Sequence, residues 1–198
     1  LPALLKGALV SLELTLTVFA LSLFFGTIVG FLRYNKHHKA GYRIATVYVE
    51  LIRNTPMLVQ IFFLYFGLPQ FKIYLPALFA GILGLTINNT AYIAEIVRSG
   101  IQSIHKGQLE AAMSLGFSKW ESMVRIIIPQ AIRNILPVIG NEFVTLIKES
   151  SQVSVIGMAD LMYTAATIQG ISFQPFPPLV IVAVYYFVMT FFVSSCLR

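Results

Sequence analysis

The chain is poor in cysteine and in charge. Its single cysteine, Cys196, excludes an internal disulfide and any metal cluster built on cysteine. Charged residues make up 11% of the sequence, whereas soluble domains carry about 25%. Hydrophobic residues make up 57%. This composition excludes an ordinary soluble domain and predicts a membrane protein.

The sequence also lacks the motifs that mark several enzyme classes. It has no Gly-x-x-x-x-Gly-Lys-Ser/Thr phosphate loop, so we expect no ATP hydrolysis in this chain. It has no Gly-x-Ser-x-Gly elbow and no His-Glu-x-x-His pair. His37, His38 and His105 lie in basic segments without zinc-ligand neighbours. An intramembrane enzyme and a metal site are therefore disfavoured.

Five apolar segments are long enough to cross a membrane, at about 20 residues each. They are roughly residues 7–32, 44–68, 75–97, 131–147 and 179–197. Between the last two, residues 153–168 are more polar at their end and predict a helix packed at the outer side. No linker divides the 198 residues. We therefore expect one all-α domain, residues 1–198, that crosses the membrane five times.

Positive charge predicts the orientation of these spans, because basic loops face the cytoplasm. The loops after the first and third spans hold Arg33, Lys36, Lys39, Arg43, Arg98, Lys106, Lys119, Arg125 and Arg133. The opposite side holds only Lys6, Lys72 and Lys148. We therefore expect the N-terminus outside and the C-terminus, at Arg198, inside. The net charge of +6 is then a topology signal and indicates no nucleic-acid site.

A polar segment, residues 107–129, lies between two of the apolar runs. Residues 108–115 are good helix formers, and Gly116 suits the C-terminus of a helix. Pro129 is expected to stop the next segment and to begin a following helix. The pattern predicts a short helix outside the bilayer that is presented to a partner. A surface helix that only connects two spans is the alternative.

The same segment resembles the EAA loop of ABC-importer permeases. Glu110, Ala111 and Ala112 are followed by Gly116, four residues after the second alanine, and later by an Ile-Pro pair. The family usually has leucine where Ile128 stands. Since the basic loops are expected inside, this loop would lie in the cytoplasm.

Three further stretches resemble the permeases of polar-amino-acid ABC importers. Residues 53–60, Arg-Asn-Thr-Pro-Met-Leu-Val-Gln, are similar to that branch's Arg-(Gly/Asn)-Thr-Pro-x-Leu-x-Gln signature. Residues 91–108 resemble its exit from span three, and residues 141–157 resemble its span-four region. Together these stretches cover more than half of the chain.

The resemblance implies a type I ABC-importer permease with five transmembrane helices and a cytoplasmic coupling helix, in a bacterial inner membrane. It implies a second permease subunit, identical or homologous, two copies of an ATPase that hold ATP and Mg²⁺, and an extracytoplasmic amino-acid-binding protein. It also implies ATP-driven import by alternating access. The ATPase would then contact Glu110, Ala111, Ala112 and Gly116.

Polar groups within the spans are the candidates for contact with substrate, because each is costly in lipid and must face protein or water. The candidate residues are Asn88, Asn89, Tyr92, Glu142, Glu50 and Thr55. Hydrogen bonding between helices is the alternative role. An excess of carboxylates at mid-depth, Glu142 with Glu50, favours a basic amino acid as substrate.

Short-range spacing predicts several local contacts. Glu50 with Arg53, and Glu95 with Arg98, are three residues apart on a helix, which allows ion pairs. Pro56 removes a helical hydrogen bond, so the carbonyl groups of residues 50–52 need other partners. The Gly-xxx-Gly spacing of residues 26–30 predicts a close helix contact. The alternative is that the two glycines have no such role.

Two other transport mechanisms remain as alternatives. A gradient-driven transporter would need inverted repeats and broken helices in matching halves, and five spans do not divide in that way. An ion channel would need a carbonyl filter loop or a ring of acidic residues, and neither is evident. A partner ATPase is the expected source of energy.

Overall fold

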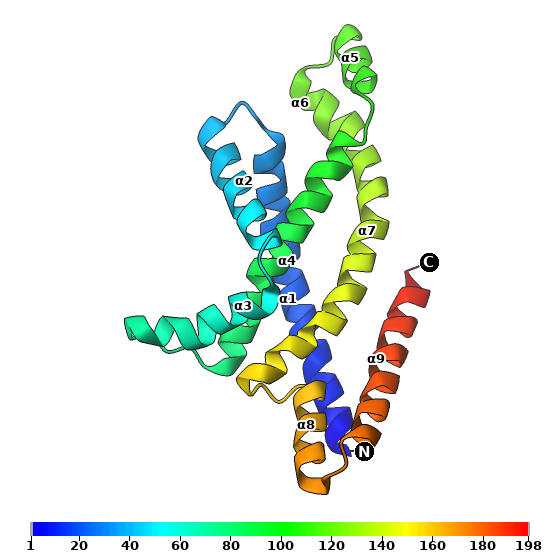
Figure 1. The fold of residues 1–198 in the computed structure, drawn as a ribbon. Coiled ribbons are helices and arrows are strands. Elements are labelled where there is room, and N and C mark those ends of the chain that lie inside the picture. The colour runs from blue at the N-terminus through cyan, green and yellow to red at the C-terminus, as the bar shows by residue number, and fades with distance from the viewer. Residues whose placement is uncertain (1, 198) are drawn as a thin grey trace.

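The structure, a computed structural model, describes residues 2–197, so that Leu1 and Arg198 lie outside it (Figure 1). The described part of the chain consists of helices joined by short turns, with no strand among residues 2–197, as expected. The α-helices are α1 (Pro2–Tyr34), α2 (Lys39–Arg53), α3 (Met57–Phe62), α4 (Ala77–Gln102), α5 (Lys106–Ser114), α6 (Lys119–Ser122), α7 (Ile128–Glu149), α8 (Leu161–Ser172) and α9 (Phe176–Cys196). The π-helices are η1 (Phe63–Gly67) and η3 (Met123–Ile127), and the 3₁₀-helices are η2 (Leu68–Phe71) and η4 (Ser150–Ile156).

Four helical runs within the described residues are long and apolar enough to cross a membrane: α1, α4, the continuous run Lys119–Ile156, and α9. The pair formed by α2 and α3 makes a fifth span when it is counted as one, although it bends by 104°. The five predicted spans are therefore present, and the fold class is confirmed. The second of them is a broken helix rather than a straight one.

The centre of the fold is the contact between α1 and α4, which lie along one another (Figure 1). A Cβ atom at Gly26 would lie 2.7 Å from the Cβ of Ile93, and one at Gly30 would lie 2.8 Å from the backbone oxygen of Ala94. Only glycine allows these two helices to approach so closely. The Gly-xxx-Gly spacing therefore marks a packing contact within the chain.

Pro129 does not stop the segment before it, contrary to the sequence-based expectation. It occupies one of the first two positions of α7, within the continuous run Lys119–Ile156. The π-helix η3 lies directly before it, and the wider turn of a π-helix suits a site where a proline has removed a hydrogen-bond donor. Pro137, inside α7, does not end the helix either.

The single helix predicted at residues 153–168 is also wrong. The chain instead ends α7 in the 3₁₀-helix η4, turns at Gly157 with a φ of +80°, and starts α8 at Leu161. Asp160 sets this boundary because its side chain accepts a hydrogen bond from the backbone N–H of Tyr163 at 2.8 Å, as an N-cap does. Ser11 of α1 accepts from the backbone N–H of Leu161 at 3.2 Å and holds α8 to α1.

The molecule has two distinct ends. The turn between α1 and α2 and the α5–α6 segment lie toward one end, whereas α8 and the start of α1 lie at the other (Figure 1). The helix α9 packs along the side of the molecule, and most of its large apolar residues are exposed. The basic loops identified in the sequence therefore gather toward the α5–α6 end.

Candidate substrate pocket and coupling surface

The bend between α2 and α3 is built by the side chains that follow α2. The backbone carbonyl of Glu50 accepts from the side-chain amide of Asn54 at 2.7 Å, and that of Leu51 accepts from the hydroxyl of Thr55 at 3.0 Å. Pro56 then begins the turn into α3. The carbonyl groups released by the proline thus find new partners, as the sequence predicts.

Gln60 closes this bend from the α3 side. Its side-chain amide donates to the backbone carbonyls of Ile52 at 2.9 Å and of Thr55 at 3.1 Å, and to the hydroxyl of Thr55 at 2.8 Å. Its side-chain oxygen accepts from the amide of Asn88, on α4, at 3.1 Å. One glutamine therefore fixes the two halves of the broken helix and joins them to α4.

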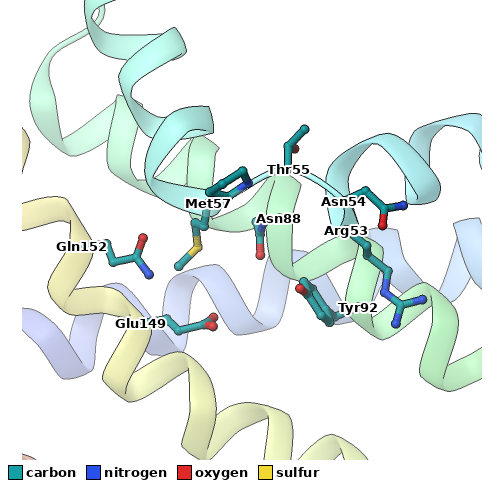
Figure 2. A pocket seen from close by; sticks show the side chains of 9 residues that line it. Arg53, Asn54, Thr55, Met57, Asn88, Tyr92, Glu149 and Gln152 are labelled. Carbon is teal, nitrogen blue, oxygen red and sulfur yellow. The ribbon is translucent and has the colours of Figure 1, made fainter.

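A polar pocket of about 340 Å³ opens at this bend (Figure 2). It is lined by Arg53, Asn54, Thr55, Pro56, Met57, Asn88, Tyr92, Glu149 and Gln152. Figure 2 shows Glu149 and Gln152 on one side of it and Arg53 and Asn54 on the other, with Asn88 and Tyr92 between them. The pocket thus joins the end of α2, the middle of α4 and the end of the α7–η4 run.

The two charged side chains of the pocket have opposite signs, and neither is engaged in a hydrogen bond with another described residue. The guanidinium of Arg53 lies 5.4 Å from the ring centroid of Tyr92, a cation–π contact, and 3.9 Å from a carboxylate oxygen of Glu95. Glu149 has no ion pair within residues 2–197. The N–H donors of Arg53 and the carboxylate oxygens of Glu149 are therefore available for hydrogen bonds with a ligand, while Arg53 keeps one long ion pair with Glu95.

Three of the six residues proposed as substrate contacts line this pocket: Thr55, Asn88 and Tyr92. Asn89 and Glu142 lie elsewhere. Asn89 is buried, and its amide donates to the carboxylate of Glu142 at 2.7 Å, which joins α4 to α7. This contact matches the alternative role, a hydrogen bond between helices.

Glu50 corrects a sequence-based expectation. Its carboxylate pairs with Arg33 of α1 at 3.1 Å, and the structure records no ion pair between Glu50 and Arg53 among the described residues. Residue spacing on one helix favoured Arg53 as the partner of Glu50, but the packing of α1 brings the buried guanidinium of Arg33 closer to that carboxylate. Glu50 does not line the pocket either.

Glu95 of α4 is the centre of an ionic cluster beside the pocket. It binds Arg33, Arg98 and, at the longer distance of 3.9 Å, Arg53. The Nε of Arg98 donates to it at 3.0 Å, which confirms the pair expected from the spacing of these two residues. With Glu50, the cluster contains three arginines and two glutamates.

The short helix predicted at residues 108–115 is present as α5, and the rest of the segment resembling an EAA loop forms α6, η3 and the start of α7. The helix ends as predicted: Gly116 has a φ of +90°, its N–H donates to the carbonyl of Met113 at 3.0 Å, and the N–H of Phe117 donates to Ala112 at 3.2 Å. This pair of bonds is a Schellman motif. A Cβ atom at Gly116 would meet nothing within 4 Å, so the glycine lies open at the surface.

The four residues proposed to contact an ATPase are not equivalent. Glu110, Ala111 and Gly116 are exposed, whereas Ala112 is buried and packs inside the segment. Two large apolar side chains, missed in the sequence analysis, lie beside them: Leu115 is 80% exposed and Trp120 is 75% exposed. Their apolar character in a polar segment is the signal that would have found them.

The family is decided by comparison with known proteins. Residues 22–198 match the family described as binding-protein-dependent transport system inner membrane component. The chain belongs to this family. It is 37% identical to the glutamine transport system permease protein GlnP of Escherichia coli (strain K12), over 100% of this chain and 90% of that protein. It is 34% identical to the arginine transport system permease protein ArtQ of Bacillus subtilis (strain 168), over 95% of this chain and 86% of that protein.

Solved structures agree with this assignment. A structure described as an amino acid ABC transporter with histidines superposes with a TM-score of 0.95 and 44% identity, over 99% of this chain and 91% of that one. The inward-facing methionine transporter MetNI matches with a TM-score of 0.77 and 19% identity, which shows the fold alone. The chain is therefore a multi-pass membrane permease subunit of an amino acid ABC importer, a family that implies ATPase and binding-protein partners.

Proposed function

We propose that the permease imports polar amino acids at the expense of ATP hydrolysed by a partner chain, and that the pocket at the bend receives the amino acid on its way across. The observation that carries this proposal is a pair of oppositely charged side chains in one polar cavity, Arg53 and Glu149, neither of which forms a hydrogen bond with another described residue. A free amino acid also carries one ammonium and one carboxylate group.

The physical requirement for such a path is a set of protein groups that replace the hydration of the amino acid. Glu149 supplies a carboxylate for an ammonium group, and Gln152, Asn54 and Asn88 supply amide groups elsewhere in the same cavity. Asn88 is held in place through Gln60, so its position is fixed before a ligand arrives. The site is thus partly preorganised, which lowers the cost of binding.

We propose a preference for basic amino acids, but the residues that support it differ from those expected from the sequence. Glu50 no longer supports it, because Arg33 neutralises that carboxylate. Glu149 and Glu142, two turns apart on α7, have no ion pair among the described residues, and with Lys148 between them this part of the helix carries a net charge of −1. A second positive charge on the ligand would meet this field. The relatives named for glutamine and for arginine bracket the expected range of substrates.

We propose that α5 couples transport to the ATPase. The exposed residues Glu110, Ala111 and Gly116, with Leu115 and Trp120, form a surface at the end of the molecule where the basic loops gather. Basic loops mark the cytoplasmic side, so the N-terminus faces outward and the C-terminus inward. Two ATPase copies, holding ATP and Mg²⁺, would then bind a pair of permease subunits, while a binding protein delivers the amino acid outside.

The test is uptake by proteoliposomes that contain the permease, its ATPase and its binding protein, with ATP enclosed. We expect uptake of arginine and glutamine that depends on ATP. Glu149→Gln should reduce uptake of arginine about tenfold or more, because a hydrogen bond to a charged group contributes about 1.5–3 kcal/mol. The matched control is Glu13→Gln, which neutralises an exposed carboxylate of α1 outside the pocket. ATP-independent uptake would overturn the proposal. Equal effects of Glu149→Gln and Glu13→Gln would mean that the amino acid does not pass through this pocket.

A further inference from the structure

We infer that Arg53 recognises the carboxylate of the bound amino acid and leaves Glu95 as it does so, so that the ligand and Glu95 compete for one guanidinium. This inference rests on the proposed function, since it assigns a role within the same pocket. It concerns the four arginine–glutamate ion pairs that the described residues contain beside the pocket.

Arg53 has the properties of a ligand-binding cation. It lines the pocket, its side chain is 38% exposed, and it is the only cation among the lining residues that the structure describes. The described residues offer it no hydrogen bond, although a guanidinium has five N–H donors. The guanidinium carbon lies over the ring of Tyr92, and this contact uses none of the N–H donors. An edge with free donors is the part of arginine that binds a carboxylate in the bidentate manner.

The ion pair between Arg53 and Glu95 is the weakest in the cluster. Its N–O distance of 3.9 Å is too long for a hydrogen bond, whereas Arg33 and Arg98 both donate hydrogen bonds to Glu95. Glu95 therefore keeps two guanidinium partners when Arg53 leaves. Arg53, in contrast, gains hydrogen bonds when it turns to a carboxylate in the pocket.

The charges of the cluster also favour the exchange. Arg33, Arg53 and Arg98 carry three positive charges, and Glu50 and Glu95 carry two negative charges, which gives the cluster a net charge of +1. No ion pair among the described residues joins Arg53 to Glu142 of α7. The carboxylate of an amino acid supplies the missing negative charge.

The exchange has a mechanical consequence, because the cluster joins three helices. Arg53 and Glu95 join the end of α2 to α4, while Glu50 and Arg33 join α2 to α1. Binding of the carboxylate loosens the first contact and leaves the second intact. The occupied pocket thereby removes one ionic contact between α2 and α4. The hydrogen bond from the hydroxyl of Tyr48 to the backbone carbonyl of Ile87, at 2.6 Å, still joins the two helices.

The experiment measures direct binding to the purified permease–ATPase complex without the binding protein. The probes are arginine and glutamine and their α-amides, argininamide and glutaminamide, which lack the carboxylate. A pH of about 6.5 keeps the ammonium of the amides charged. We expect wild type to bind the acids about tenfold or more tightly than the amides, and Arg53→Gln to abolish this difference. Arg43→Gln, which removes an exposed cation from the same helix α2, should preserve it.

Two further variants test the competition by the sign of their effects. Glu95→Gln removes the competitor, so it should tighten binding of the acids several-fold and leave the amides unchanged. Arg98→Gln takes a partner from Glu95, which should then hold Arg53 more firmly and weaken binding of the acids several-fold.

A third variant, Arg53→Lys, keeps the positive charge but lacks the planar guanidinium that binds a carboxylate through two N–H groups. It should retain part of the preference for the acids.

The outcomes separate the two proposals. An Arg53→Gln variant that weakens acids and amides equally would overturn the inference, as would weaker binding of the acids by Glu95→Gln. A wild-type complex that binds none of the four probes would instead overturn the proposed function.

Discussion

The pocket and the coupling surface differ from their surroundings in opposite ways. The pocket places amides, a guanidinium and a carboxylate among apolar spans, and the coupling surface places Leu115 and Trp120 in a polar segment at one end of the molecule. In each region some of these groups lack a partner: Glu149 has no ion pair among the described residues, and Leu115 and Trp120 are exposed. Both contrasts cost free energy in the isolated chain, and a ligand or a partner would recover it.

The largest expected effect tests the coupling surface. Gly116→Trp should abolish ATP-dependent uptake and release the ATPase from the purified complex, because bulk at an open site blocks contact with a partner. The substitution also strains the backbone by about 1–2 kcal/mol, since φ is +90°. Gly157→Trp is the matched control, with a φ of +80° and equally open space near the other end of α7. Loss of the ATPase from both variants would attribute the effect to strain.

The second prediction tests which carboxylate of α7 belongs to the pocket. Glu142→Gln should reduce uptake of arginine only a few-fold, because Asn89 can still donate to the new side-chain oxygen and the residue does not line the pocket. Glu149→Gln should reduce it about tenfold or more. Uptake of radiolabelled arginine by the two variants in parallel measures the ratio. A larger effect at Glu142 would place the substrate nearer to α4 and α7 than the pocket does.

The third prediction tests how much Gln60 stabilises the bend beside the pocket. Gln60→Leu leaves the carbonyl of Thr55 and the amide of Asn88 without their partners, which should lower the free energy of unfolding by about 1–3 kcal/mol. Thermal unfolding in detergent measures this loss. Gln108→Leu, at an exposed position of α5, should change it far less. Equal stability of the two variants would mean that water replaces Gln60 at the bend.

These two regions also differ in how far the sequence predicts them. The coupling helix follows from local signals, since helix formers and a C-terminal glycine act within one segment. The pocket does not, because Glu149 comes directly after a lysine at the end of a span and only the meeting of α7 with α2 and α4 places it in a cavity. Likewise, Pro56 predicts a break, but the 104° bend depends on side chains from both sides of it. Glu50 illustrates the same limit, because its partner comes from another helix.

The smallest expected effect comes from a buried carboxylate outside both regions. Burial raises the pKa of Asp160, the N-cap of α8, from 3.8 to about 6. Because the folded state binds the proton more tightly than the unfolded state, its contribution to stability is present at low pH and is lost as the pH rises through about 6. The free energy of unfolding should therefore rise by about 1 kcal/mol between about pH 7.5 and about pH 5. Asp160→Asn keeps an N-cap side chain and should remove this increment, which urea unfolding at the two pH values measures. An unchanged pH dependence in Asp160→Asn would show that Asp160 is solvated in the folded protein and does not carry this increment.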